Sequence, residues 1–201
     1  MSATSIAIID SGGANIASLL YALQRLSRIA TLTTDAEIIR TAERVILPGV
    51  GAARDAMQRL KQHKLVDVIR NLNQPVLGIC LGLQLLAEAS EEDDVECLGI
   101  IPGTARRLPA DSTCPVPNMG WCPLSKTSEH PLLDGLDNGT YFYFLHSYAL
   151  PVSAHTLASA EHAEPFSAVI GHRNFVAAQF HPERSSAAGS RLLQNFLGLQ
   201  P

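Results

Sequence analysis

The sequence has no apolar run long enough to cross a bilayer, and its first residues carry neither a basic stretch nor the apolar core of a signal peptide. Basic residues are neither abundant nor clustered: 15 lysines and arginines stand against 19 acidic residues, which gives a net charge of -4. No block of them is suited to follow a phosphate backbone. We therefore expect a soluble, cytoplasmic protein that binds neither a membrane nor nucleic acid.

Cysteines are few, and none of the four, at positions 80, 97, 114 and 122, forms a C-x-x-C pair. At 201 residues, of which 46% are hydrophobic, the chain can bury a sizeable core without disulfide bonds. We therefore expect reduced thiols, and a free thiol in a reducing compartment can serve as a nucleophile.

The histidines lack the spacing of metal ligands, because no H-x-x-x-H or H-x-H pair occurs. Those at positions 63, 130, 155, 162 and 172 stand in polar or loop-like surroundings. We expect neither a metal nor another cofactor. His146, which follows an aromatic run, either lines a pocket or satisfies a buried hydrogen bond.

The chain shows no internal repeat, low-complexity tract or interdomain linker, so we expect one domain over residues 1–201. In the first half, short β-branched runs alternate with segments of helical spacing, which is typical of a parallel sheet covered by helices. The expected strands are residues 6–9, 29–32, 45–47 and 76–79. The expected helices lie within residues 16–26, 52–61, 65–71 and 83–87.

The pattern changes near residue 91. Acidic residues, prolines and glycines up to about residue 131 predict loops and short antiparallel strands. Strand signals return at residues 141–145, 168–170 and 175–180, before a closing helix over residues 191–197. The prediction is a single α/β domain, a mainly parallel sheet flanked by helices with an antiparallel extension in the C-terminal half.

A G-x-C-x-G motif, residues 78–82, stands where the fourth expected strand must turn into a helix. It is the cysteine counterpart of the serine nucleophile elbow. Its glycines permit a tight turn that exposes the thiol of Cys80 at the carboxyl edge of the sheet, before the positive end of a helix dipole that favours thiolate. The alternative is that Cys80 is a small buried hydrophobic residue, as most free cysteines are.

The segment Phe180-His181-Pro182-Glu183 supplies the base that a cysteine nucleophile needs and a group to orient that base. Side chains two apart in an extended backbone project the same way, so Glu183 can hold one imidazole nitrogen of His181 and leave the other for the thiol. The alternative is a strand-end histidine beside a solvated glutamate. The preceding strand and the candidate nucleophile favour the catalytic interpretation.

A glycine-rich loop, Pro48-Gly49-Val50-Gly51, ends the third expected strand. Acyl transfer needs N–H donors aimed at the developing oxyanion, and glycines let backbone amides turn toward a ligand. The loop therefore offers a donor beside the amide of Leu81, unless it is an ordinary strand-to-helix turn.

Together, the elbow at residues 78–82, Gln84 one turn later and the segment at residues 180–183 resemble the class I, triad-type glutamine amidotransferases. Nearly the full length is also similar to the glutaminase subunits of imidazole glycerol phosphate synthase, an enzyme of histidine biosynthesis. That closer likeness rests on four stretches, residues 8–10, 47–52, 119–121 and 144–148. Other triad amidotransferases usually have a P-G-G loop at the oxyanion position, so P-G-V-G favours this subfamily.

The resemblance implies hydrolysis of glutamine, with Cys80 as nucleophile, His181 as general base and acid, and Glu183 as its orienting residue. It implies oxyanion amides at Leu81 and at Val50, the latter after a peptide reorientation. The residues that it implies around the amino-acid end of the substrate are Gly51, Gln84, Ser147 and Tyr148. Met119, Trp121 and Arg184 would face the partner of a heterodimer, a cyclase subunit that uses the ammonia to make imidazole glycerol phosphate and an aminoimidazole carboxamide ribotide.

One stretch and two single positions depart from the family pattern. Ser11-Gly12-Gly13-Ala14-Asn15 stands where Y-G-M-G-N is common, Asn118 where a histidine usually precedes Met-Gly-Trp, and Arg184 where lysine commonly follows H-P-E. None is a member of the triad. Arginine and lysine differ in reach and in hydrogen-bond geometry, so these departures bear on the interface and its signalling.

Three alternative functions are also compatible with such a sequence. One is a triad amidotransferase that serves a vitamin B6, anthranilate or purine pathway, which the P-G-V-G loop and the Met-Gly-Trp turn disfavour. Another is a catalytically dead binding or regulatory subunit, which the intact triad disfavours. The third is a cysteine peptidase or thiol chaperone on a related α/β fold, which the His-Pro-Glu segment and Gln84 disfavour.

Overall fold

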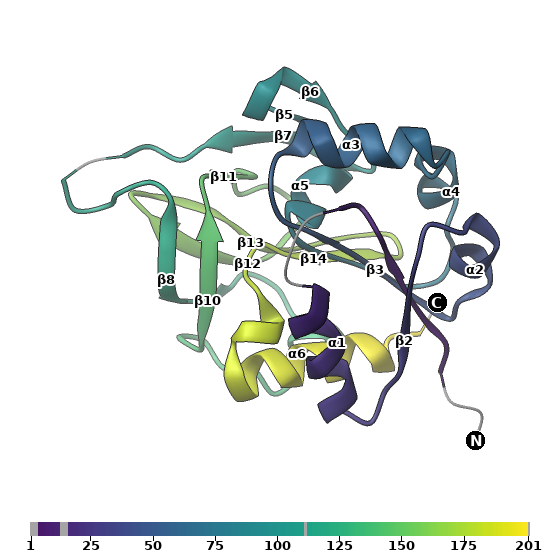
Figure 1. The fold of residues 1–201 in the computed structure, drawn as a ribbon. Coiled ribbons are helices and arrows are strands. Elements are labelled where there is room, and N and C mark those ends of the chain that lie inside the picture. Colours follow the sequence, from purple (N-terminus) through teal and green to yellow (C-terminus); the bar gives the residue numbers. More distant parts are fainter. Residues whose placement is uncertain (1–3, 13–15, 111, 201) are drawn as a thin grey trace.

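An eight-stranded sheet forms the centre of the fold in the computed structural model, which describes residues 4–12, 16–110 and 112–200 (Figure 1). Its spatial order is β2-β1-β3-β4-β14-β13-β12-β9. The strands are β1 (Ile6–Ile9), β2 (Ala30–Thr33), β3 (Arg44–Gly49), β4 (Val76–Cys80), β9 (Ser125–Lys126), β12 (Thr156–His162), β13 (Glu164–His172) and β14 (Phe175–Ala178). The pairs from β2 to β14 are parallel and those from β14 to β9 antiparallel, which confirms the expected mixed sheet.

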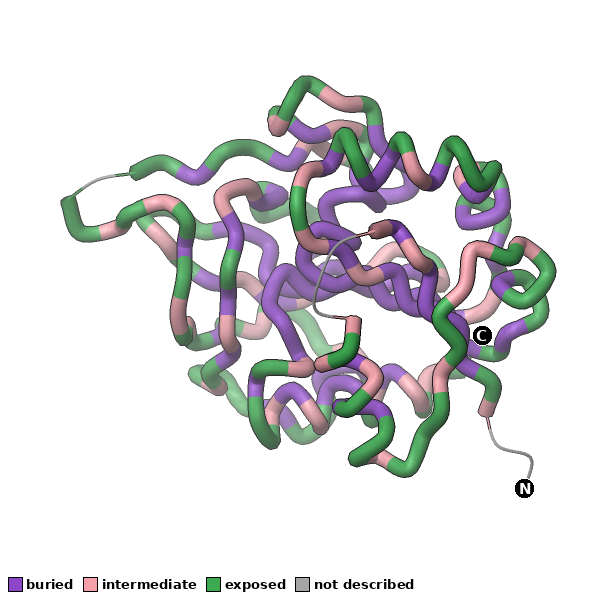
Figure 2. The backbone as a smooth tube through the Cα atoms, viewed as in Figure 1, coloured by how far each residue is buried: buried purple, intermediate pink, exposed green. Residues whose placement is uncertain are grey.

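Helices cover both faces of this sheet (Figure 1). One face carries α1 (Ile16–Arg25) and α6 (Ser186–Gly198), and the other carries α2 (Ala36–Thr41), α3 (Ala53–Gln62), α4 (Val66–Arg70) and α5 (Leu81–Leu86). Side chains alternate across the strands, so Ile6 and Ile8 pack with α1 while Ala7 and Ile9 pack with α3. The central strands β1, β3, β4 and β14 are therefore buried on both sides, as Figure 2 shows, whereas the edge strand β2 is partly exposed.

The chain that follows α5 forms a second, four-stranded sheet in the order β11-β7-β5-β6. Its strands are β5 (Ala87–Ser90), β6 (Val95–Glu96), β7 (Ile101–Arg107) and β11 (Tyr148–Ala149). The helix expected to extend through Ala87 ends at Leu86. The carbonyls of its last two residues accept hydrogen bonds from the following chain, Leu85 from the Leu98 amide at 2.8 Å and Leu86 from the Ile100 amide at 2.9 Å. The short antiparallel strands expected between residues 91 and 131 are present, since β6 pairs antiparallel with β5 and β7 with β11, but β7 also pairs in parallel with β5.

Two further strands, β8 (Asn118–Pro123) and β10 (Tyr141–His146), form a separate antiparallel pair. The strand expected at residues 141–145 is confirmed, but the turn expected around Trp121 is a strand. Trp121 pairs with Tyr143 and Asn118 with His146, contacts between segments more than twenty residues apart. Local sequence signals carry no information on such a pairing.

The sequence did not predict α2 or the short 3₁₀ segments. Helix α2 begins at an N-cap, Asp35, whose Oδ1 accepts from the amides of Glu37 and Ile38 at 2.7 and 3.3 Å. Three short 3₁₀ segments are η1 (Glu92–Asp94), η2 (Pro131–Leu133) and η3 (Pro182–Arg184).

Of the divergent stretch at residues 11–15, Ser11 and Gly12 are described, while Gly13, Ala14 and Asn15 lie outside the described residues. Within the described ranges, no helix has the length and apolar character needed to cross a membrane.

Candidate active site

Cys80 stands at the junction between β4 and α5 with φ +53° and ψ -108°, a conformation that L-residues rarely adopt and that costs on the order of 1–3 kcal/mol. Strand β4 lies between β3 and β14, which holds the turn from both sides. Gly82 is required by close approach, because a Cβ there would lie 1.8 Å from the carbonyl oxygen of Leu47. The motif thus forms the strained elbow expected, with the strain at Cys80 itself.

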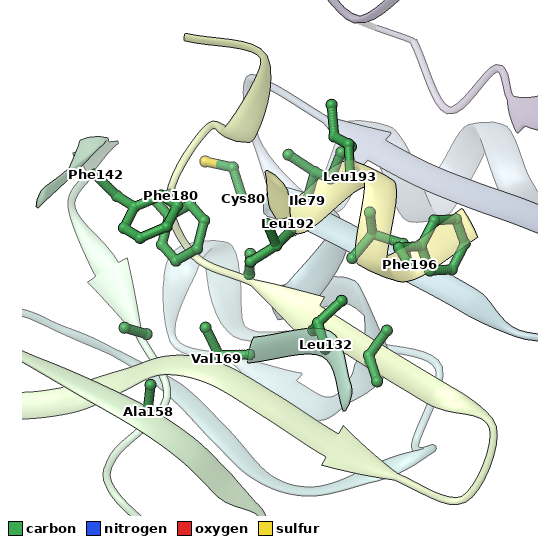
Figure 3. Close-up of a cluster of buried hydrophobic side chains, with 14 of the residues drawn as sticks. Ile79, Cys80, Leu132, Phe142, Ala158, Val169, Phe180, Leu192, Leu193 and Phe196 are labelled. Carbon is green, nitrogen blue, oxygen red and sulfur yellow. The ribbon is translucent and has the colours of Figure 1, made fainter. Parts of the chain in front are cut away.

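The thiol is less exposed than expected, since Cys80 is only 6% exposed. It belongs to the hydrophobic cluster that contains Phe142, Phe180 and Leu192 (Figure 3). Sequence reasoning had offered an exposed nucleophile or a buried hydrophobic residue, and the structure combines the two. Cys80 is buried at the edge of the hydrophobic core, where it also lines a cavity.

His181 and Glu183 meet as expected, with 2.8 Å between Nδ1 and Oε1. The geometry differs from a simple extended strand, because β14 ends at Ala178 and the chain enters the 3₁₀ segment η3 at Pro182. Phe180 stacks on Phe142 at a centroid distance of 4.0 Å, and the His181 amide donates to the Tyr143 carbonyl at 2.9 Å. Packing against β10 therefore fixes the histidine.

Burial alone would lower the pKa of His181, but its hydrogen bonds to Cys80 and Glu183 and the charges of those two groups outweigh burial and raise the pKa to about 10. The imidazole therefore keeps its proton at neutral pH. An imidazolium placed between a sulfur and a carboxylate can stabilise a thiolate and later deliver a proton to a leaving group.

A cavity of about 240 Å³ opens beside the thiol. Its walls come from the β3 loop, the elbow, η1 and the chain around β10 and β11. They comprise Val50, Gly51, Cys80, Leu81, Gln84, Glu92, Pro117, Leu145, His146, Ser147, Tyr148 and His181. The structure thus brings together the residues assigned from sequence to the nucleophile, base, oxyanion amides and substrate. In the described part of the chain, no group of three or more His, Cys, Asp or Glu side chains is arranged to hold a metal ion.

The three residues assigned to a partner lie outside this cavity. Met119 and Trp121 are 67% and 51% exposed on β8. Trp121 meets the ring of Tyr143 edge-on at 6.1 Å, and the guanidinium of Arg184 lies 4.9 Å from the centroid of the same ring. Trp121 and Arg184 therefore share one surface cluster around Tyr143.

Sequence reasoning missed Glu92, which lines the cavity. Its Oε2 accepts from the amide of Ala53 at 3.0 Å, and so caps α3, whose N-cap residue Ala52 makes no side-chain hydrogen bond. The acidic stretch around Glu92 predicted only a loop. Its link to a helix 39 residues away exists only in the folded chain.

His146 does both of the things proposed for it, since it lines the cavity and satisfies buried hydrogen bonds. Its Nδ1 donates to the Tyr148 carbonyl at 3.0 Å, and its Nε2 lies 3.1 Å from Nδ2 of Asn118. A carbonyl only accepts, so the proton is on Nδ1 and Asn118 donates to Nε2. Burial lowers the pKa of His146 to about 4, although the Tyr148 hydrogen bond opposes that shift.

This buried neutral histidine predicts loss of stability in mild acid. The unfolded chain takes up a proton at about pH 6.5 and the folded chain at about pH 4, so the free energy of unfolding falls as pH drops across that window. The loss is up to roughly 3 kcal/mol. Urea unfolding at several pH values should show a shallower pH dependence in His146→Gln than in the wild type. His63→Gln, at an exposed histidine, should keep the wild-type slope; equal slopes in His146→Gln and wild type would contradict the assignment.

The chain matches a known family over nearly its whole length. The family model of class-I glutamine amidotransferases matches residues 7–199. The chain is 52% identical over 195 residues to "Imidazole glycerol phosphate synthase subunit HisH 2" of Legionella pneumophila (strain Paris), covering 97% of this chain and 98% of that protein. It is 44% identical over 201 residues to the HisH subunit of Vibrio cholerae, with coverage of 97% and 98%.

Solved structures support the fold. The crystal structure of a glutamine amidotransferase superposes with a TM-score of 0.74 at 18% identity, over 96% of this chain and 97% of that one. PurLQS from Thermotoga maritima gives 0.69 at 16% identity, over 98% and 99%. At these identities the structures show the fold alone. The family model and the HisH relatives, which cover nearly the whole chain, show that it belongs to the class-I glutamine amidotransferases and, among them, to the HisH subunits of imidazole glycerol phosphate synthase.

Proposed function

We propose that the chain hydrolyses glutamine to glutamate and ammonia and delivers the ammonia to a separate cyclase subunit of imidazole glycerol phosphate synthase. The observation that carries this proposal is the placement of Cys80, His181 and Glu183. A strained cysteine and a proton-bearing histidine line one cavity large enough for a small polar molecule, and a buried carboxylate holds the histidine from outside that cavity.

The reaction follows from these positions. The thiolate of Cys80 attacks the side-chain amide carbon of glutamine, and the electron pair of the C=O bond moves to oxygen. When the C–N bond breaks, His181 gives its proton to the nitrogen, and ammonia leaves. Water, deprotonated by His181, then attacks the thioester and frees glutamate and the thiol. Glu183 holds Nδ1 of the imidazole throughout.

Backbone amides supply the oxyanion site in this proposal. The amide of Leu81 follows the nucleophile directly, as in other nucleophile elbows. Val50 lines the same cavity from the opposite loop, and its amide joins Leu81 after the peptide turns. Each such donor contributes typically about 10²- to 10³-fold in turnover.

The amino-acid end of glutamine lies, in our proposal, against Gly51, Gln84, Ser147 and Tyr148. Glu92 adds the opposite charge that a substrate ammonium group requires, and its carboxylate retains acceptor capacity beside the bond from Ala53. A peptidase substrate has no free ammonium group at this point, so the arrangement favours free glutamine.

The partner surface combines the cluster of Trp121 and Arg184 with Met119, which is exposed two residues before Trp121 on β8. Tryptophan and arginine are the residues most enriched among energetically dominant interface contacts. We take the partner to be the cyclase that makes imidazole glycerol phosphate and an aminoimidazole carboxamide ribotide, because the relatives carry the name of that synthase. The free cysteines fit a reducing compartment, so we place the reaction in the cytoplasm.

Ammonia release from glutamine by the purified chain, with and without the cyclase and its ribonucleotide ligand, tests the proposal. Release that depends on glutamine and increases with the ligand-bound cyclase is the expected result. A chain that binds the cyclase but releases no ammonia would be the regulatory subunit of the second alternative.

Glu183→Gln is expected to lower turnover by about 10²- to 10⁴-fold, less than loss of Cys80. A glutamine amide that presents its N–H₂ to Nδ1 favours the wrong imidazole tautomer but leaves the nucleophile and cavity in place. Glutaminase kinetics of the complex measure the effect. Glu129→Gln, which changes a surface carboxylate that is 91% exposed, is the matched control and should leave turnover unchanged. Unchanged turnover in Glu183→Gln would show that the third triad member is misassigned.

A further inference from the structure

A chain of buried amide groups runs beneath the elbow and ends at the thiol. Gln179, next to the last residue of β14, is fully buried, with no exposed surface. Its Nε2 lies 3.8 Å from Sγ of Cys80, and its Oε1 lies 3.3 Å from Nε2 of Gln84. Nε2 of Gln84 also donates to the Tyr148 carbonyl at 2.8 Å. A completely buried polar side chain that contacts the nucleophile requires an explanation, because its burial has a free-energy cost.

The direction of these hydrogen bonds is fixed at the far end. The Tyr148 carbonyl can only accept, so Gln84 must present its N–H₂ group there. The same nitrogen contacts Gln179, which must therefore present its oxygen to Gln84. The remaining amide nitrogen of Gln179 then faces the sulfur of Cys80. The Tyr148 carbonyl thus fixes the orientation of both glutamine amides, and in that orientation Gln179 presents an N–H donor to the sulfur.

The sulfur has competing neighbours. The Leu145 carbonyl, 3.6 Å away, accepts from the thiol and so favours the protonated form. The N–H of Gln179 favours the thiolate, as does the protonated His181. Removal of the Gln179 donor leaves the Leu145 carbonyl acceptor in place and takes away one of the groups that oppose it.

We propose that the side-chain N–H of Gln179 stabilises the thiolate of Cys80, and that Gln84 is the positioning residue that holds the Gln179 amide in that orientation. The inference rests on the proposed function of Cys80 as the nucleophile. It also gives Gln84 a second role besides its contact with substrate. A filler role for Gln179 would change the stability of the fold without changing the ionisation of the thiol.

The test compares the full-length chain with Gln179→Met, which keeps the side-chain length and removes the donor. Iodoacetamide alkylation of Cys80, followed by mass spectrometry of its peptide across pH, reports the thiolate fraction directly. The pH of half-maximal alkylation should rise by about one unit in Gln179→Met, which is a roughly tenfold lower rate at pH 7. Glutaminase turnover should fall by a similar factor at pH 7 and recover at higher pH.

Two further variants test the role of Gln84 and the specificity of the effect. Gln84→Met should raise the alkylation midpoint by less, because Gln179 keeps its donor but loses its fixed orientation. Gln74→Met, in which a half-buried amide bonded to the Ile39 and Arg40 carbonyls is removed, should leave the midpoint unchanged.

An unchanged midpoint in Gln179→Met overturns the inference, whatever the ammonia release of the wild-type chain. If Gln179→Met fails to fold, an unchanged midpoint in Gln84→Met overturns it equally. A wild-type chain that releases no ammonia but loses thiol reactivity on Gln179→Met overturns only the proposed function.

Discussion

Cys80→Ala is expected to abolish glutamine hydrolysis, with a loss of at least about 10⁴-fold in turnover. The sulfur forms the bond to the substrate carbon in the proposed reaction, and no other cysteine lines the same cavity among the described residues. The fold should survive, because the substitution removes one atom that borders the cavity and leaves the core contacts of the elbow in place. Glutamate formation measures the activity, and a thermal unfolding curve checks the fold.

The matched control is Cys97→Ala, a substitution at the other buried cysteine. Burial raises the pKa of the Cys97 thiol to about 11, only partly opposed by the charge of Lys61, so this residue stays protonated and unreactive at neutral pH. Cys97→Ala should therefore retain turnover. Substantial glutaminase activity in Cys80→Ala would remove the basis for the nucleophile assignment, whereas loss in both variants would point to damage of the fold.

The parts of the site that the sequence predicted are those encoded locally. The elbow needs Gly82 at a position where no Cβ fits and a strand that ends at Cys80, and five consecutive residues carry both requirements. His181 and Glu183 are two residues apart, so their contact survives even though the backbone forms a 3₁₀ turn that was not expected. Short-range geometry tolerates an error in the expected secondary structure.

The parts that the sequence did not predict depend on long-range pairing. Asn118 reads as part of a turn until β8 pairs with β10 and brings it to His146. Glu92 reads as a solvated acidic residue until it caps α3. Gln179 reads as one more strand residue until Gln84, 95 positions away, contacts its amide beneath the thiol. Each contact joins elements whose relative positions follow from packing of the whole domain.

The loop that we propose as the oxyanion site, residues 48–51, has the features of a switch. Gly51 adopts φ +97°, and a Cβ on it would meet nothing within 4 Å, so the chain after Val50 leaves room for rotation of the peptide between Gly49 and Val50, which carries the Val50 N–H. The Ser11 hydroxyl donates to the Pro48 carbonyl at 2.7 Å and anchors the start of the loop. Ser11 is one of the residues that depart from the family pattern, so the anchor belongs to this sequence. Because the loop is anchored at Pro48 and unhindered at Gly51, the Val50 N–H can turn without displacement of β3.

The cyclase with its ligand is therefore expected to stimulate glutaminase turnover by about 10²- to 10³-fold over the isolated chain, the value of one added oxyanion donor. Ammonia made on a free subunit would be protonated and lost, so low basal activity serves the coupled reaction. Titration of the chain with cyclase, with and without ligand, measures the stimulation. Full activity in the isolated chain, indifferent to the cyclase and its ligand, would contradict the switch.

Trp121→Ala should weaken docking of the cyclase by about 1–3 kcal/mol, or roughly 5- to 150-fold in Kd, because it removes an exposed aromatic anchor and its edge contact with Tyr143. The stimulation should fall with it at sub-saturating cyclase, while the cyclase supplied with ammonium salt should work as before. Ile29→Ala is the matched control: Ile29 is 88% exposed but precedes β2, at the strand end away from the elbow, and its loss should leave docking unchanged. If Trp121→Ala and Ile29→Ala bind the cyclase equally well, the interface lies elsewhere on the molecule. If ammonium-driven synthesis also fails with Trp121→Ala, the substitution acts on the cyclase reaction and not on the transfer of ammonia.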